Sequence, residues 1–157
     1  MAPVTIDAFG GDRETLRPLF RMADDSEQEI DRYLLDGEIL TAVDGGAVVG
    51  HLQLVNAGPD GVVELTSMAV IETRRGHGVG RALVEEAVRR SRSRGARRLV
   101  VATAAADTGN LRFYQRLHFR MVRIERDVFS PEAGYAEGTL IDGIPLRDRV
   151  WLERALE

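Results

Sequence analysis

Short stretches of alternating apolar and polar residues recur along the chain, and a period of two predicts half-buried β-strands. They cover residues 4–9, 38–43, 47–55, 62–71 and 119–126. Asp44, Gly45 and Gly46 separate the second stretch from the third, and glycine supplies the positive φ that a tight hairpin turn needs. The pattern therefore predicts a first strand and, later in the chain, an antiparallel meander of three strands that ends at residue 71.

Other stretches repeat their apolar residues every three to four positions, which predicts amphipathic helices. Residues 26–29 (SEQE) have the form of a capping box that opens one of them. The predicted helices lie around Leu16, Leu19 and Phe20, after residue 26, from Val79 through Val88 to a stop at Gly95, and over residues 110–117. The apolar run 98–104 is typical of a buried parallel strand, and residues 147–156 form a last strand. We expect one α/β domain over residues 1–157.

Composition narrows the chemistry that such a domain can perform. The chain contains no cysteine and no lysine, which excludes disulfides, thiolate ligands, Schiff bases and a Walker lysine. No spacing of His, Asp and Glu indicates a metal site. A net charge of −4 disfavours nucleic acid as a partner, and the arginine cluster at residues 89–98 is interpreted as a solvated face.

The same composition gives no sign of a membrane protein. No apolar run approaches the roughly 20 residues that span a bilayer. The N-terminal residues lack the basic and then apolar pattern of a secretion signal. The expected location is therefore the cytoplasm, and no membrane partner is expected.

The most informative segment is RRGHGVG, residues 74–80, which lies between a predicted strand and the long helix. Glycine lets the backbone approach a ligand closely, and the first N–H groups of a helix lack internal partners and carry positive partial charge. The segment predicts a diphosphate held by backbone amides, with charge added by Arg74, Arg75 and Arg81. A plain flexible turn is the alternative. The Rossmann pattern does not fit, because Arg81 stands where its last glycine belongs.

This segment resembles motif A of the GNAT superfamily of N-acetyltransferases, in which a glutamine or arginine is followed by two spaced small residues. Arg75, Gly78 and Gly80 match those positions. A second signature, asparagine followed by Phe-Tyr and Gly-Phe, is matched by NLRFYQRLHF at residues 110–119, with His118 in place of glycine. Histidine tolerates the left-handed conformation expected there better than most residues. The resemblance covers nearly the whole chain and implies a mixed sheet of six to seven strands with about four helices, splayed after the motif-A strand.

The resemblance also implies acetyl-CoA as co-substrate and no metal. The pantetheine arm would lie in the splay against the backbone of Met68 and Val70, and the Val70 N–H would polarise the thioester carbonyl. The residues expected to contact acetyl-CoA are Met68, Ala69, Val70, Arg75, Gly76, His77, Gly78, Val79, Gly80, Arg81, Asn110 and Tyr114.

Direct acetyl transfer needs an amine that has lost a proton, and a proton helps the departing thiolate. Glu64 lies on the strand of Val70, in the register where histone-acetylating members of the superfamily place a base glutamate. Tyr114 matches the tyrosine that other members place near the cofactor sulfur as general acid. His51 is a second candidate base, although a structural histidine is the simpler interpretation, and water is a third.

The acceptor remains open at this level. In the superfamily, the segment between the first two helices and the loop before the last strand determine which acceptor is bound. In this chain those segments hold Asp24, Asp25, Asp127, Glu132, Tyr135, Glu137 and Asp142. Their acidity favours a cationic amine, with a small molecule preferred over a protein or peptide amine. A non-catalytic acyl-CoA sensor is the alternative. Apolar residues of the last strand could meet a second copy, which would make a homodimer.

Overall fold

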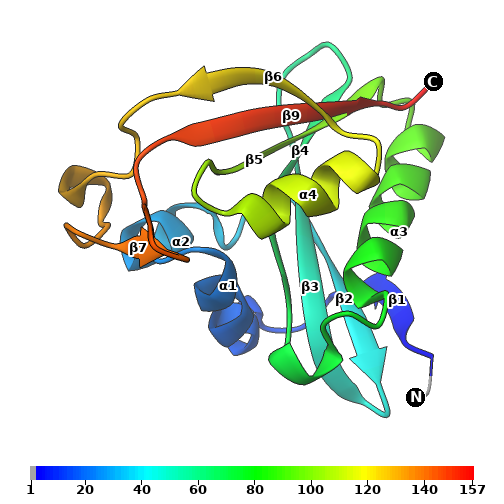
Figure 1. Ribbon diagram of the computed structural model, residues 1–157. Helices are drawn as coiled ribbons and strands as arrows, with labels where there is room; N and C mark the ends of the chain where they lie inside the picture. The colour runs from blue at the N-terminus through cyan, green and yellow to red at the C-terminus, as the bar shows by residue number, and fades with distance from the viewer. Residues whose placement is uncertain (1–2) are drawn as a thin grey trace.

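Figure 1 shows the computed structural model of the protein, which describes residues 3–157. Seven strands form one sheet in the order β1-β2-β3-β4-β5-β9-β6, and four α-helices accompany them in this part of the chain. The predicted mixed sheet of six to seven strands with about four helices is therefore confirmed. The elements are β1 (Thr5–Ala8), α1 (Arg17–Ala23), α2 (Glu27–Tyr33), β2 (Glu38–Asp44), β3 (Ala47–Asn56), β4 (Val62–Val70), α3 (Val79–Ser93), β5 (Arg98–Ala104), α4 (Thr108–Arg116), β6 (Arg120–Glu125) and β9 (Arg149–Ala155).

The sheet joins an antiparallel half to a second antiparallel half through one parallel contact. Strands β2 to β4 pair antiparallel, as the meander pattern predicts, and β1 adds to them antiparallel beside β2. β4 and β5 are parallel, and β9 then lies antiparallel between β5 and β6. Because β9 is an inner strand, its Val150 and Leu152 are buried in the core. These two apolar residues are therefore not available to a second copy of the chain.

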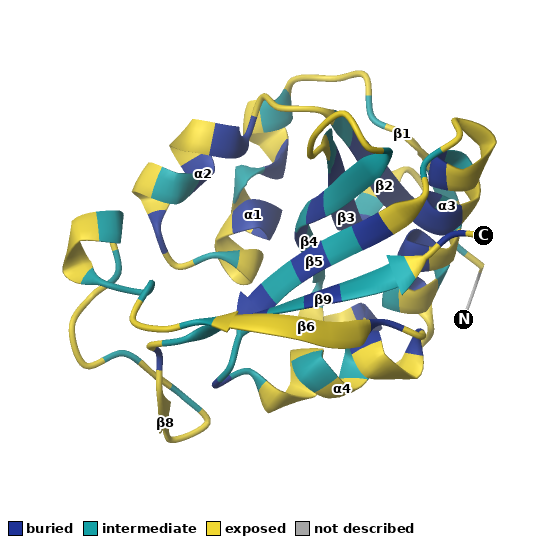
Figure 2. Cartoon of the chain, turned by 90° about the horizontal axis from the view of Figure 1, so that it is seen from above, coloured by how far each residue is buried: buried dark blue, intermediate teal, exposed yellow. Residues whose placement is uncertain are grey.

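Helices cover both faces of the sheet. α3 and α4 pack on one face in the larger core cluster, which includes Leu83, Leu99 and Leu152. α1 and α2 pack on the other face in a smaller cluster around Phe20 and Ile30. Figure 2 shows α4 on one side of β9 and β6, with α1 and α2 on the other side of the sheet. Each large apolar side chain buried in this way contributes about 1.5–3 kcal/mol, which holds the strands in place even where their pairing is incomplete.

The pairing between β4 and β5 is much shorter than the strands themselves. Residues 62–65 of β4 pair with residues 98–101 of β5, whereas β4 continues to Val70 and β5 to Ala104. The ends of the two strands therefore separate, which confirms the predicted splay. Residues 66–70 of β4 and 102–104 of β5 no longer pair with each other, and we call them together the splayed segment.

The start of α2 follows the capping prediction in part. Ser26 is the N-cap, and its hydroxyl accepts a hydrogen bond from the Glu29 N–H at 3.2 Å. In place of the reciprocal bond of a full capping box, the Ser26 N–H donates to Asp24 at 3.0 Å, and Glu29 pairs with Arg32. The cap thus ties α2 to the segment before it.

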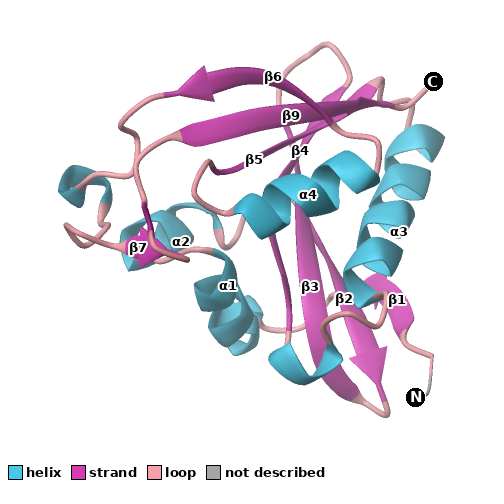
Figure 3. Cartoon of the chain, viewed as in Figure 1, coloured by secondary structure: helices cyan, strands magenta, loops and turns pink. Residues whose placement is uncertain are grey.

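The stretch before β9 contains structure that the sequence pattern did not predict. It forms a 3-10 turn at Pro131–Ala133 and a small hairpin of β7 (Leu140–Ile141) with β8 (Ile144–Pro145). Strands of two residues are too short to show a period. Figure 3 shows this segment beside α2, and the Ser26 hydroxyl donates to the Ala133 carbonyl at 2.7 Å. The loop before the last strand is therefore anchored on the start of α2.

Candidate active site

A β-bulge in β4 determines which side chains face each side of the sheet. Gln53 of β3 pairs with Ser67 and Leu54 pairs with Leu65, so Thr66 is an extra residue. The Thr66 hydroxyl donates to the buried Gln53 side chain at 2.6 Å. One signal of this tie is visible in the sequence, a polar residue inside the apolar run of β3, and the prediction missed it.

The Gln53 side chain also holds the C-terminal end of α2. Its amide donates to the carbonyl of Tyr33 at 2.7 Å and to that of Asp36 at 2.9 Å. The Tyr33 carbonyl also accepts a bond from the Asp36 N–H at 3.0 Å, so the glutamine binds the turn that ends α2. One buried glutamine therefore joins the bulge in β4 to the end of α2.

The bulge shifts the alternation of β4 by one residue. Leu65, Met68 and Val70 all face the larger core with α3 and α4. Ser67 faces the other side, where it lies 2.8 Å from the His51 ring. Glu64 precedes Leu65 and, because successive strand residues alternate, faces the α1 and α2 side.

The backbone of Met68 and Val70 is turned toward the splayed segment. The Ile71 N–H donates to the Val49 carbonyl of β3 at 2.9 Å, and successive residues direct their backbone groups to opposite strand edges. The N–H groups of Val70 and Met68 therefore point toward β5. No residue of β5 pairs with these two in the described part of the chain. By the same alternation, the backbone groups of Ala69 turn toward β3.

The turn between β4 and α3 has the backbone geometry expected of an anion cradle. Gly76 and Gly78 have φ angles of 75° and 84°, which only glycine adopts without strain. α3 begins after Gly78 without a side-chain cap, so its first N–H groups are available to a ligand. Gly80 serves packing instead, because a Cβ there would lie 3.3 Å from the Phe113 ring of α4. The His77 ring remains within the turn, with Nδ1 2.9 Å from the carbonyl oxygen two residues earlier.

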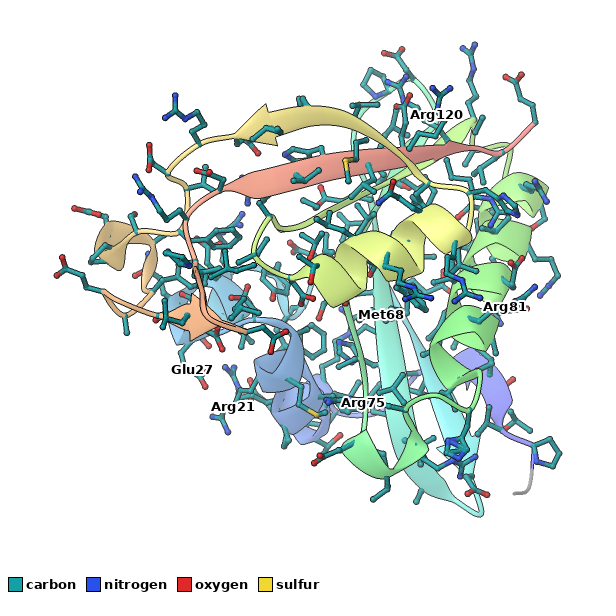
Figure 4. All side chains as sticks on the ribbon, in the orientation of Figure 1. Arg21, Glu27, Met68, Arg75, Arg81 and Arg120 are labelled. Atoms are coloured by element: carbon teal, nitrogen blue, oxygen red, sulfur yellow. The ribbon has the colours of Figure 1, made fainter. Side chains whose placement is uncertain are left out.

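The three arginines of this segment have different surroundings. Arg75 is exposed, and its Nε donates to the Val70 carbonyl at 3.0 Å. Arg81 is exposed on α3, and Figure 4 labels it together with Arg75. Arg74 is buried and ion-paired with Asp44. The expectation that Arg74 adds charge to the cradle is therefore wrong, because its charge is neutralised within the protein.

Tyr114 of α4 belongs to the larger core, on the side of the sheet that α3 and α4 cover. It is 4% exposed, and its ring makes edge-on contacts with Phe113 and Phe119, at centroid distances of 5.1 and 5.5 Å. Burial, with a smaller effect from the Asp107 charge, raises the pKa of the Tyr114 phenol above its usual value. The phenol therefore carries its proton throughout the physiological pH range.

Both ends of α4 are fixed by local contacts. Near its start, the Asn110 side chain donates to the Thr103 hydroxyl of β5 at 3.3 Å. At its end, His118 has a φ of 71°, which confirms the left-handed conformation predicted at this position. These contacts set the position of Tyr114 relative to β5.

Glu64 occupies the opposite face of the sheet and is partly buried. Burial raises the pKa of its carboxyl group, while the charges of Arg149 and Arg32 oppose that shift. A carboxylate whose pKa is raised toward neutrality is a better proton acceptor than an exposed one. Glu64 and Tyr114 thus stand on opposite faces, with the splayed segment between them.

His51 has the surroundings of a structural residue. It is fully buried, its Nε2 lies 2.8 Å from the Ser67 hydroxyl, and its ring lies 4.4 Å from that of Phe20. Its Nδ1 has no hydrogen-bond partner among the described residues. Burial lowers the pKa of His51 to about 3, so the ring is neutral and a poor proton acceptor near neutral pH.

Two segments that the sequence associated with the acceptor meet at Asp24. Its carboxylate accepts hydrogen bonds from the hydroxyl of Tyr33 at 3.0 Å and from that of Tyr135 at 2.7 Å. Burial raises the pKa of both phenols, so both remain donors. The Asp24 carboxylate therefore joins the α1–α2 segment to the loop before β9.

A cavity of about 450 Å³ lies elsewhere, at the other end of β4, where Gly37, Gly61 and Gly95 are among its lining residues. It touches none of the candidate catalytic residues. Within residues 3–157 no group of three or more His, Cys, Asp and Glu could hold a metal ion. In the same range no helix is long and apolar enough to cross a membrane.

The fold and this site have counterparts among known proteins. Residues 12–119 match the model of the acetyltransferase (GNAT) family. The chain is 32% identical over 139 residues to YvbK, an uncharacterized N-acetyltransferase of Bacillus subtilis strain 168, and the match covers 88% of each protein.

Two solved structures are similar over almost their full length. One is a Bacillus subtilis acetyltransferase in complex with CoA, with a TM-score of 0.88 and 30% identity over 98% of this chain and 99% of that one. The other is a GNAT family acetyltransferase of Elizabethkingia anophelis with acetyl-CoA bound, with a TM-score of 0.88 and 26% identity over 99% of each chain.

The raised pKa of Glu64 predicts a pH-dependent effect on stability. Its folded pKa lies above the unfolded value of about 4.3, so the stability of the wild type falls as pH rises between the two values. We predict that Glu64→Gln, which has no carboxyl to ionise, is more stable than the wild type near neutral pH and equally stable below the unfolded pKa. Chemical denaturation across this pH range measures the difference, with Glu137→Gln on an exposed loop as control for the lost charge. A wild type that is the more stable protein at neutral pH would contradict the prediction.

Proposed function

Because the chain belongs to the GNAT family of acetyltransferases, we propose that it moves the acetyl group of acetyl-CoA directly to a primary amine, with a small molecule as the favoured acceptor. Acetyl-CoA is the co-substrate, since structures similar over nearly the whole chain hold CoA or acetyl-CoA. Both substrates would be bound at the same time, so that the acetyl group passes between them without resting on the protein.

One observation carries this proposal: the end of β4–β5 pairing leaves an unpaired backbone edge between a protonated phenol and a partly buried carboxylate. Tyr114 lies with α3 and α4 on one face, and Glu64 faces α1 and α2 on the other. A thioester placed along the splayed segment would have its sulfur on the Tyr114 side and its carbonyl carbon open to attack from the Glu64 side.

The cradle at the start of α3 accounts for the other end of the cofactor. The free N–H groups after Gly78 and the positive end of the helix dipole suit the pyrophosphate. Arg75 and Arg81 are exposed nearby and add positive charge. In this arrangement Gly76, His77, Val79 and Gly80 contribute backbone rather than side-chain contacts, and Asn110 contributes from the start of α4.

The residues then divide the proton transfers between them. As the amine nitrogen forms its bond to the carbonyl carbon, Glu64 takes the amine proton, directly or through one water. The Val70 N–H stabilises the negative charge that develops on the carbonyl oxygen. As the C–S bond breaks, the Tyr114 hydroxyl gives its proton to the leaving sulfur. The products are an amide and CoA, and solvent restores both side chains.

Two other functions remain as alternatives. A sensor that binds acyl-CoA without turnover would share the cradle but would not need Glu64 or Tyr114. An acetyltransferase for protein or peptide amines would share the chemistry and differ in the acceptor. Release of free CoA thiol in the presence of a panel of small amines and peptides separates all three: the sensor releases none, and the other two differ in which amines accelerate release. A homodimer remains a prediction.

The cradle predicts a ligand-dependent gain in stability. At about 100 times its dissociation constant, acetyl-CoA should stabilise the fold by roughly 2.7 kcal/mol. Gly78→Asp should abolish this gain, because it adds a Cβ and a negative charge where the pyrophosphate would lie. Gly95→Asp is the matched control, since Gly95 also has a positive φ and open space around it but follows the end of α3. Thermal shifts with and without acetyl-CoA measure both, and equal gains in the two variants would argue against the cradle.

The base role predicts a pH-dependent kinetic defect. Glu64→Gln keeps the shape and removes the proton acceptor, so kcat/KM should fall by roughly 10²–10⁴ near neutral pH. The defect should shrink at high pH, where more of the amine is already deprotonated. Initial rates across pH with one amine test this. A defect of the same size at every pH would assign Glu64 to acceptor binding, and an unchanged rate would leave the proton to water.

The acid role can be tested by removing one oxygen atom. Tyr114→Phe keeps the ring contacts, so acetyl-CoA affinity should stay nearly unchanged while kcat falls. The fall should be smaller than for Glu64→Gln, because a thiolate is already a fair leaving group. Direct binding measurements combined with steady-state rates separate the two effects. Weaker cofactor binding with normal turnover would show that Tyr114 serves packing alone.

A further inference from the structure

One face of β5, β9 and β6 is only partly covered and lies next to the splayed segment. Along β5 the residues alternate, with Leu99, Val101 and Thr103 buried and those between them half-exposed. Figure 2 shows these half-exposed positions on β5 and the neighbouring β9. Glu64 pairs with Val100 of β5 and, because paired residues share a face, belongs to the same face. Here an acceptor amine would approach Glu64.

Arg149 stands beside the splayed segment on this face. It pairs with Ala104, the last residue of β5, so their Cα atoms lie about 5 Å apart. Ala102 and Ala104, the half-exposed residues at this end of β5, have small side chains. The Arg149 charge also acts on Glu64, where it opposes the rise in pKa that burial causes. Arg149 is therefore near the place where the amine would react.

The Arg149 guanidinium is held in place but retains an unused donor. Its Nε and Nη2 lie 3.0 and 2.9 Å from the same oxygen of Glu125, which also accepts a bond from the Trp151 ring N–H. The guanidinium carbon lies 5.5 Å from the Trp151 ring centre. Its Nη1 makes no hydrogen bond within residues 3–157. The group is thus oriented by three contacts while one edge remains for a ligand.

The local charge balance favours an anion. Arg123 also approaches Glu125, at 3.7 Å, and lies over the same Trp151 ring at 4.8 Å. Two guanidinium groups thus share one carboxylate, which leaves a net positive charge. Glu153, the other acid of this face on β9, pairs with Arg98 at 3.9 Å.

Two of the six acidic residues that favoured a cationic acceptor are engaged in the structure, whereas Asp25, Glu132, Glu137 and Asp142 are exposed. Asp24 accepts bonds from two tyrosine hydroxyls and the Ser26 N–H. Asp127 accepts a bond from Arg147 at 3.0 Å. With Asp24 and Asp127 paired, Arg149 is the cation beside the end of β5 on the face that also carries Glu64. Its positive charge would complement an anionic group of the acceptor.

We propose that Arg149 binds a carboxylate of the acceptor, so that the preferred substrate is a primary amine that also carries a carboxylate group, as amino acids do. The amine would lie at Glu64 and the carboxylate at the free edge of the guanidinium. Arginine suits this role because its planar donors match a carboxylate. The inference rests on the proposed acetyl transfer and specifies its acceptor.

Acceptor pairs that differ only in this charge test the inference. Straight-chain amino acids of increasing length are compared with their primary amides, with rates corrected for the fraction of free amine, and aminoalkylphosphonates test whether phosphate replaces carboxylate. For the best length, the wild type should prefer the acid by on the order of 10- to 100-fold in kcat/KM, as expected for one charge-assisted contact. Arg149→Gln should remove that preference, mainly through KM for the acid, and Arg149→Lys should keep part of it.

Arg123→Gln is the matched control, because Arg123 touches the same tryptophan and glutamate but lies on β6, one strand further from the splayed segment. It should keep the preference for the acid. Equal rates for acids and amides in the wild type, or a preference that survives Arg149→Gln, would overturn the inference while leaving acetyl transfer intact. A stronger preference for phosphonates would replace the carboxylate with a phosphate-bearing acceptor. A wild type that acetylates none of these amines or the broader amine panel would instead overturn the proposed function, and this inference with it.

Discussion

The structure depends on one interruption: hydrogen bonding between β4 and β5 stops after residues 65 and 101, although both strands continue. A parallel pair would normally bury the backbone edges of both strands. Here β4 keeps its contacts with β3 through residue 70 and loses those with β5. The Met68 and Val70 backbone groups that are freed in this way line one side of the gap between the strands. Glu64 and Tyr114 lie on opposite faces of the sheet beside this gap.

Several contacts maintain this interruption. The bulge at Thr66 diverts β4, and its hydroxyl bonds to Gln53, which is itself tied to the end of α2. On the other side, Asn110 joins α4 to Thr103 of β5. The larger core packs α3 and α4 against both strands. The strands are thus held apart by packing on each side, and the unpaired edge does not depend on flexibility.

Much of the fold could be predicted from the sequence, because its elements follow local rules. The strands of the meander, the stripe of α3 and the glycines at 76 and 78 each depend on residues close together in the chain. The parts that were missed depend on distant residues. Tyr135 reaches Asp24 across 111 positions, Gln53 reaches both α2 and β4, and Arg149 is positioned through Glu125. Arg74 belongs to the same class, since only the fold reveals that Asp44 takes its charge. No period or motif records such contacts, so the glycine turn before α3 was easier to predict than the contacts around Asp24 and Arg149.

The most direct test of this account is a crystal structure of the protein with acetyl-CoA or a non-hydrolysable analogue. The account predicts that the thioester lies along residues 66–70 and 102–104, with its carbonyl oxygen about 2.7–3.1 Å from the Val70 nitrogen. The sulfur should lie on the Tyr114 side, and the carbonyl carbon should be open toward Glu64. A pantetheine arm that runs outside the splayed segment, or a thioester oxygen bound by a group other than the Val70 N–H, would contradict it.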